Sequence, residues 1–168
     1  DALAKVGLDA VAGTVMQLPV GAIYVDPRLA EAGLRIAAPH EADILSLLDS
    51  MPVEQSKYDE HRINLGLPDG SRDLVPEKSV LLENGFDELN GVDWNKGCYM
   101  GQEVTARTKH RGLVKKRLMP VTIDGEAPEP GTTIMAGERE AGEMHSSSGA
   151  QGLAMIKLDY LGGDVGLS

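Results

Sequence analysis

The residue pattern of this chain changes near Gly112, and this change constrains the fold more than any other feature. Before it, residues 54–65 have helical spacing, with one face formed by Tyr58, His61, Arg62 and Leu65. After it, short alternating segments are separated by glycine and proline, which is typical of antiparallel strands. The expected strands span residues 117–123, 132–135, 139–146 and 151–158. We therefore expect an α+β chain, with a mixed α/β unit over residues 1–111 and an antiparallel β unit over residues 112–168.

The mixed unit is expected to combine a strand pair with two helices. The expected strands are residues 20–25 and 34–37, and the expected helices are residues 41–50 and 54–65. The first strand ends at the turn Asp26-Pro27-Arg28, where proline fixes the corner. Residues 67–93 show little periodicity and are predicted to be mainly loop, and a loop of this length is usually functional or disordered.

The strongest chemical signal surrounds Cys98, the only cysteine of the chain. Glycines on both sides of it favour a tight turn, and residues 102–111 are predicted to form a short helix with Gly112 as its left-handed cap. Cys98 would then lie on a loop near a helix N-terminus, where partial positive charge, together with Lys96, stabilises a thiolate. A lone cysteine is also often a small buried hydrophobic residue, and both interpretations stay open.

Charge is distributed unevenly along the chain, whose formal net charge is −10. Residues 105–118 contain six of the 16 Lys/Arg residues and none of the 26 Asp/Glu residues. This basic segment can attract an anionic ligand tail, a phosphate backbone or an acidic partner, and the alternative is a solvated helix face followed by an exposed strand. The six residues are Arg107, Lys109, Arg111, Lys115, Lys116 and Arg117.

Composition excludes several classes of function. No apolar run approaches the roughly 20 residues that a membrane-spanning helix needs. One cysteine excludes an internal disulfide and a self-contained four-cysteine zinc or iron–sulfur site, and the four histidines lack metal-ligand spacing, so no metal site is expected. Aromatic residues are scarce, so no stacking platform for single-stranded nucleic acid is evident, and no direct sequence-specific nucleic-acid binding is expected. The chain lacks a basic-then-apolar leader and an initial Met, so we expect a processed or excised piece.

A family resemblance rests on the string Lys-Gly-Cys-Tyr-Met-Gly-Gln-Glu at residues 96–103. With Thr-Ala-Arg-Thr at 105–108 and Lys-Arg-Leu at 116–118, it resembles the signature of the YgfZ family. That family comprises folate-binding proteins of iron–sulfur cluster maintenance related to the glycine-cleavage T-protein, GcvT, and this sequence is similar to its mitochondrial assembly-factor branch. The resemblance implies the second half of a GcvT-like folate-binding α/β domain over residues 1–111, followed by a small antiparallel β-barrel over residues 112–168.

The resemblance also implies a functional thiol and a tetrahydrofolate site. Cys98 is the expected functional thiol, and Glu83 is the candidate that would hold the pterin edge, with a solvent-facing Glu83 as the alternative. Relatives hold folate in a channel lined by both halves of the domain, so this chain alone is expected to lack part of the pocket. The expected folate-binding residues are Glu83, Asn84, Lys96, Gly97, Tyr99, Gly101, Gln102, Glu103 and Arg107.

Three functions are compatible with these features. The first is a YgfZ-type protein that supports iron–sulfur cluster assembly or repair and affects tRNA modification only indirectly. The second is a folate-dependent aminomethyltransferase of the T-protein type, which the Cys98 motif disfavours, and the third is an interaction module with a packed cysteine. Whether the chain catalyses a reaction stays open. The expected partners are iron–sulfur client or assembly proteins, in a bacterial cytoplasm or, in a eukaryote, the mitochondrial matrix.

Overall fold

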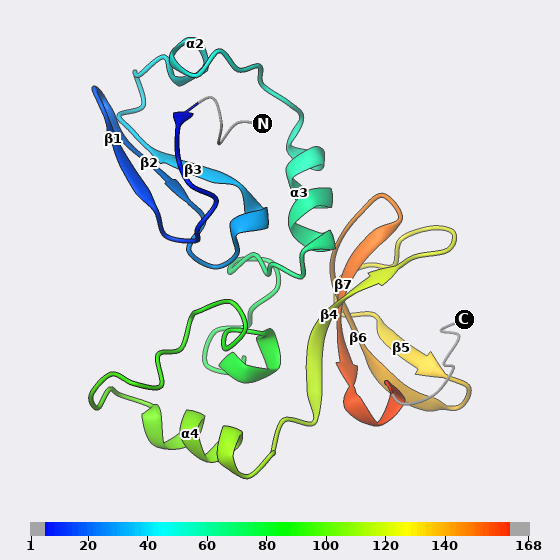
Figure 1. Ribbon diagram of the computed structural model, residues 1–168. Coiled ribbons are helices and arrows are strands. Elements are labelled where there is room, and N and C mark those ends of the chain that lie inside the picture. The colour runs from blue at the N-terminus through cyan, green and yellow to red at the C-terminus, as the bar shows by residue number, and fades with distance from the viewer. Residues whose placement is uncertain (1–5, 162–168) are drawn as a thin grey trace.

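The computed structural model describes residues 6–161, which form two antiparallel sheets joined by helices and ordered loops (Figure 1). The N-terminal sheet has the order β1-β2-β3, with strands β1 (Val15–Leu18), β2 (Gly21–Val25) and β3 (Leu34–Ala37). The C-terminal sheet has the order β4-β7-β6-β5, with strands β4 (Lys116–Thr122), β5 (Thr133–Ala136), β6 (Arg139–Ser148) and β7 (Gln151–Lys157).

The helices are short and connect the two sheets. They are α2 (Ile44–Leu47), α3 (Gln55–Asn64) and α4 (Gln102–His110), with 3₁₀ turns η1 (Ala30–Ala32), η2 (Leu81–Asn84) and η3 (Leu158–Tyr160). Figure 1 shows α3 between the two sheets, and α4 beyond the long loop that follows it. None of the described helices is long and apolar enough to span a bilayer.

The core lies where α3 meets the C-terminal sheet. Ile63 of α3 is fully buried against three residues of β4 and β7, which are Leu118, Leu153 and Met155. Ile63 is the only apolar residue of α3 that is buried; the other buried residues of this helix are Asp59 and Arg62. Because buried charges are costly unless they are paired and hydrogen-bonded, this interface needs polar partners from outside the helix.

Most of the expected elements are confirmed, and the helix over residues 102–111 is found as α4 with Gly112 at a φ of 59°. The strands at 20–25 and 34–37, the helix at 54–65 and the four strands after residue 116 are also present. Residues 67–93 are mainly loop, as predicted, but hydrogen-bonded turns and η2 order them. The strand β1 was not predicted.

Two predicted boundaries are wrong. The helix expected at 41–50 is only α2, because two of its leucines, Leu45 and Leu47, stay exposed and supply no packing to extend so short a helix. The strand expected to end at residue 146 continues to Ser148, because Ser147 and Ser148 pair with Gly152 and Gln151 across a two-residue turn. The first turn residue, Gly149, has a φ of 60°, which suits the twist of a tight hairpin.

One glycine of the C-terminal sheet marks a close backbone approach. A Cβ added at Gly142 would lie 2.3 Å from the carbonyl oxygen of Met155 on the neighbouring strand. We expect Gly142→Ala to lower the free energy of unfolding by about 1–3 kcal/mol, because the backbone of a packed sheet must shift. Thermal unfolding measures this, with Gly70→Ala as the control because a Cβ there meets nothing within 4 Å. Equal melting temperatures for the two variants would contradict the prediction.

Candidate functional site

The Cys98 thiol is exposed on the loop that precedes α4. Gly101 takes the left-handed conformation, with a φ of 86°, at the N-terminal end of the helix, as the glycine pattern predicted. Exposure excludes the interpretation of Cys98 as a buried hydrophobic residue. The ammonium of Lys96 lies 4.7 Å from the centroid of the Tyr99 ring, so the structure shows a cation–π contact for this lysine. The role of Cys98 as a functional thiol stays a prediction.

The surface around the thiol combines apolar and charged side chains. Met100 is fully exposed and Val104 is largely exposed, which is uncommon for two apolar residues so close in the chain. Glu103 and Arg107 form an ion pair one helical turn apart on the exposed side of α4. In the described structure, the charges of Glu103 and Arg107 therefore pair with each other.

A cleft of about 360 Å³ opens between the loop before η2 and the C-terminal sheet. Glu83 and Asn84 line it, together with Lys116 and His145 from the sheet. Asn84 is 2% exposed; its amide nitrogen donates to the Val80 carbonyl over 2.8 Å, but its Oδ1 accepts no hydrogen bond from the described residues. Because buried acceptors are normally satisfied, Asn84 Oδ1 is a candidate contact for a bound molecule or water. The Glu83 carboxylate makes one long ion pair, with its Oε2 atom 3.7 Å from the Lys116 ammonium.

A second cavity of about 300 Å³ lies between residues 77–82 and α4, and Gly101 and Val104 line it. Lys78 and Ser79 line both cavities, so one loop separates the Glu83 cleft from the helix that follows Cys98. The remaining predicted folate-binding residues line neither cavity; they are Lys96, Gly97, Tyr99, Gln102, Glu103 and Arg107. Of the predicted set, the neighbours Glu83 and Asn84 line the first cleft and Gly101 lines the second cavity, and the complete set stays a prediction.

The basic segment is largely neutralised by nearby carboxylates. Four of its six cations form ion pairs, namely Arg107–Glu103, Lys109–Asp87, Lys116–Glu83 and Arg117–Glu88. Three of these carboxylates come from residues 83–88, which lie immediately before the Cys98 loop in the sequence. These ion pairs attach α4 and β4 to residues 83–88. They weaken the interpretation of the basic segment as a patch that is free to bind an anionic partner.

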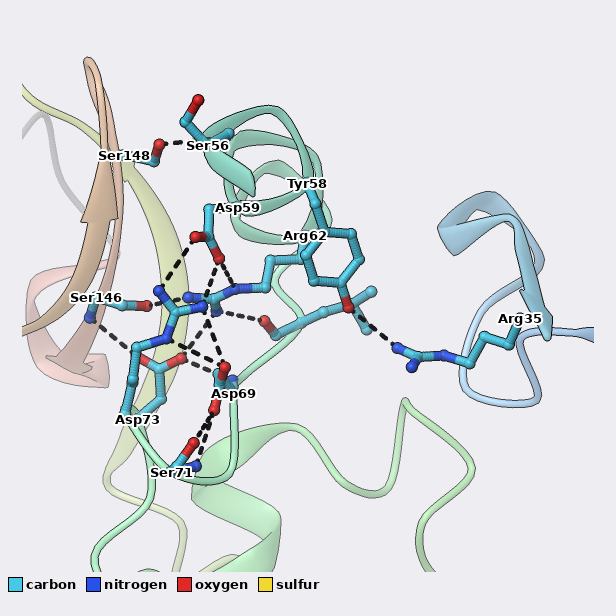
Figure 2. A network of polar contacts seen from close by, with 12 residues as sticks. Arg35, Ser56, Tyr58, Asp59, Arg62, Asp69, Ser71, Asp73, Ser146 and Ser148 are labelled. Atoms are coloured by element: carbon cyan, nitrogen blue, oxygen red, sulfur yellow. Dashed lines mark hydrogen bonds and ion pairs between the residues drawn. The ribbon is translucent and has the colours of Figure 1, made fainter. Parts of the chain in front are cut away.

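A buried polar network at the base of α3 was not predicted (Figure 2). Arg62 is 2% exposed and donates to the Asp59 carboxylate over 2.8 Å, the Asp73 carboxylate over 2.9 Å and the Ser146 hydroxyl over 2.8 Å. Asp73 also accepts from the backbone N–H groups of Ser146 and Asp69. The network joins α3, the loop after it and β6, immediately beside the cleft residue His145. The sequence signal for it was limited to Arg62 within the helix predicted at residues 54–65.

The electrostatics of this network follow from its hydrogen bonds. Contacts from Arg72 and Arg62 hold the pKa of Asp59 below its usual value, against the opposing effect of burial. The Nε2 atom of His61, the neighbour of Arg62, lies 3.0 Å from the Glu31 carbonyl oxygen, so this ring links α3 to η1. Within residues 6–161 no three His, Cys, Asp or Glu side chains gather closely enough to hold a metal ion.

Comparison with known proteins identifies relatives of this chain. Residues 115–167 match the family model for the CAF17 C-terminal β-barrel domain, which confirms the predicted β-barrel. The mitochondrial iron–sulfur cluster assembly factor IBA57 of Mus musculus is 35% identical over 146 residues, or 83% of this chain and 40% of that protein. The Homo sapiens protein of that name is 36% identical over 145 residues, with the same coverage.

A third relative matches a shorter part of the chain. The IBA57 homologue of Neurospora crassa is 40% identical over 106 residues, which are 62% of this chain and 24% of that protein. The chain thus spans 40% or less of the length of these curated relatives. All three names place the relatives in mitochondria, which agrees with the eukaryotic half of the predicted localisation and not with the cytoplasm. By these similarities and its C-terminal barrel, the chain belongs to the YgfZ/GcvT-like family, among whose members are the IBA57 iron–sulfur cluster assembly factors.

Proposed function

We propose that this protein supports iron–sulfur cluster assembly or repair in the mitochondrial matrix, with Cys98 as its functional thiol. The observation that carries the proposal is an exposed cysteine in a chain that is 35% identical over 146 residues to an iron–sulfur cluster assembly factor. The cluster is cargo here. The expected partners are the assembly or client proteins that deliver or receive it.

The chemistry of Cys98 in this role is that of one thiolate ligand. Iron–sulfur clusters are commonly held by four protein ligands, so one cysteine cannot hold a cluster alone. The missing ligands must come from a partner protein or a second copy of this chain. The exposed side chains of Met100 and Val104 lie near Cys98 in the sequence and offer apolar surface that such a partner would cover.

We further propose that the Glu83 cleft contributes to binding of a tetrahydrofolate-type ligand. The aminopyrimidinone edge of a pterin presents N–H donors, and Glu83 and Asn84 Oδ1 are acceptors with spare capacity. A volume of about 360 Å³ suits part of such a ligand. Bound folate would supply one-carbon chemistry, while Glu83 and Asn84 would orient its ring.

The folate proposal is tested by titrating the chain with reduced folates and following ultraviolet absorbance. We expect Glu83→Gln to weaken binding about tenfold or more, because a charge-assisted hydrogen bond is lost. Glu88→Gln is the matched control, since Glu88 pairs with Arg117 and does not line the cleft. Equal affinities for the two variants would remove the cleft from folate binding.

The thiol proposal is tested by replacing Cys98 with serine. We expect the variant to lose transfer of a cluster to an acceptor protein, while its stability changes by less than about 0.5 kcal/mol because the side chain is exposed. Labelling by iodoacetamide at neutral pH, read by mass, reports on the accessible thiol of the unchanged chain. A native protein that labels only after denaturation, or a serine variant with full transfer activity, would refute the proposal.

A further inference from the structure

The Cys98 loop, residues 92–101, leads into α4, and its first seven residues make no hydrogen bonds of regular secondary structure. In the described part of the chain, no backbone–backbone hydrogen bond involves residues 92–98. Asp93 closes a local turn by accepting from the N–H groups of Asn95 and Lys96, which shapes the loop but does not attach it to the rest of the protein. Side chains must therefore determine where the loop lies.

One cluster of three side chains provides that attachment. The Trp94 indole N–H donates to one oxygen of the Asp87 carboxylate over 2.5 Å, and the Lys109 ammonium donates to the other over 2.9 Å. The Lys109 ammonium also lies 4.0 Å from the centroid of the Trp94 ring, so each pair within the cluster is in contact. The same contacts, from Lys109 first and Trp94 second, hold the pKa of Asp87 below its usual value.

The three residues come from three different segments. Trp94 lies four residues before Cys98, Lys109 lies in the last turn of α4, and Asp87 lies four residues after Glu83. The cluster therefore links the arm that leads to Cys98 to the helix that follows it and to the segment that carries Glu83.

We propose that Asp87, Trp94 and Lys109 are positioning residues that hold the Cys98 loop on α4 and on the Glu83 segment. Without the Asp87 carboxylate, the Trp94 indole N–H and the Lys109 ammonium lose their common acceptor. The remaining link between Trp94 and α4 would be the cation–π contact with Lys109. The consequence for cluster chemistry rests on the proposed function of Cys98. The positioning itself does not, because it is defined by contacts that do not involve the thiol.

Trp94 is the only tryptophan of the chain, so its fluorescence reports directly on this cluster. We expect Asp87→Asn and Lys109→Met to shift the Trp94 emission to longer wavelength and to raise its quenching by acrylamide about twofold, as the indole becomes more exposed to water. Lys109→Arg should restore the native spectrum, because arginine keeps both the charge and the ability to stack on an aromatic ring.

Hydrogen exchange tests whether the loop moves when the cluster is broken. The protected amides near the loop are those of Asn95 and Lys96, which donate to Asp93, and that of Gln102, which donates to the Tyr99 carbonyl. We expect these three amides to exchange about five to ten times faster in Asp87→Asn, with exchange in β6 and β7 unchanged, because only a local opening becomes easier. Glu88→Gln breaks the neighbouring Arg117 ion pair and serves as the matched control.

The outcomes separate this inference from the proposed function. All measurements are made without folate or a partner and are repeated in a Cys98→Ser background, where they should be the same. Unchanged emission and unchanged loop exchange in both variants would overturn the inference, as would equal effects from Glu88→Gln. A uniform rise in exchange throughout the chain would also overturn it, because it would indicate general destabilisation rather than positioning.

Discussion

Replacing Arg62 with methionine is expected to lower the free energy of unfolding by about 3–5 kcal/mol, because the buried Asp73 carboxylate loses its cationic partner and Asp59 keeps only the partly exposed Arg72. Asp73 is fully buried, and Asp59 is nearly so. Methionine keeps most of the volume of the arginine stem but none of its donors to Asp59, Asp73 and Ser146. A small domain has about 5–15 kcal/mol of stability in total, so the variant should unfold at much lower urea concentration.

Arg72 is the matched control for this experiment. It contacts Asp59 and Asp69, but its side chain is 42% exposed and water can replace it. We expect Arg72→Met to cost about 1 kcal/mol or less, as for other exposed ion pairs. Similar urea midpoints for the Arg62 and Arg72 variants would show that the buried network does not stabilise the junction between α3 and the C-terminal sheet.

Replacing Asp26 with asparagine is expected to lower the free energy of unfolding by about 2 kcal/mol at pH 7, because charge-assisted hydrogen bonds lose their anion. Asp26 is 1% exposed and accepts from the Arg28 side chain over 2.8 Å and from the Arg35 side chain over 2.5 Å. Arg35 also donates to the Tyr58 hydroxyl over 3.1 Å. Asp26 therefore connects the turn after β2 to β3 and, through Arg35, to α3.

The Asp26 effect should depend on pH in one direction. Burial raises the pKa of this carboxyl, but hydrogen bonds from Arg28 and Arg35 outweigh burial and bring the pKa well below its usual value. A lowered native pKa means that the stabilisation is complete above the unfolded-state pKa of about 3.9 and declines as the pH falls below it. The difference between the wild type and Asp26→Asn should therefore be largest near pH 7 and should shrink below about pH 4.

Urea unfolding of both proteins at several pH values between 7 and 3 measures this dependence. Asp124→Asn is the control, since Asp124 is exposed and makes none of the arginine contacts of Asp26. A stability difference that stays constant over the whole range, or one that grows as the pH falls, would contradict the assignment of the Asp26 charge to folding.

Local sequence signals were sufficient to predict α4, its glycine cap and the turn that carries Cys98, although they left the exposure of the thiol open. These features depend on residues within about one helical turn of each other, so their chemistry can be read from neighbours in the chain. The same holds for the strands after residue 116, whose alternation and glycine turns reflect one buried face. The family resemblance rests on this same local segment, and the comparisons confirmed it.

The tertiary structure alone decided how these local elements are held together. Arg62 meets Asp73 from 11 positions away and Ser146 from 84 positions away, and Asp87 meets Lys109 from 22 positions away. No periodicity or spacing indicates such partners, because long-range pairing depends on which faces pack after the chain has folded. Tertiary packing likewise decided the length of α2: its leucines have helical spacing in the sequence, but two of them, Leu45 and Leu47, remain exposed, and without burial that spacing supports only a single turn.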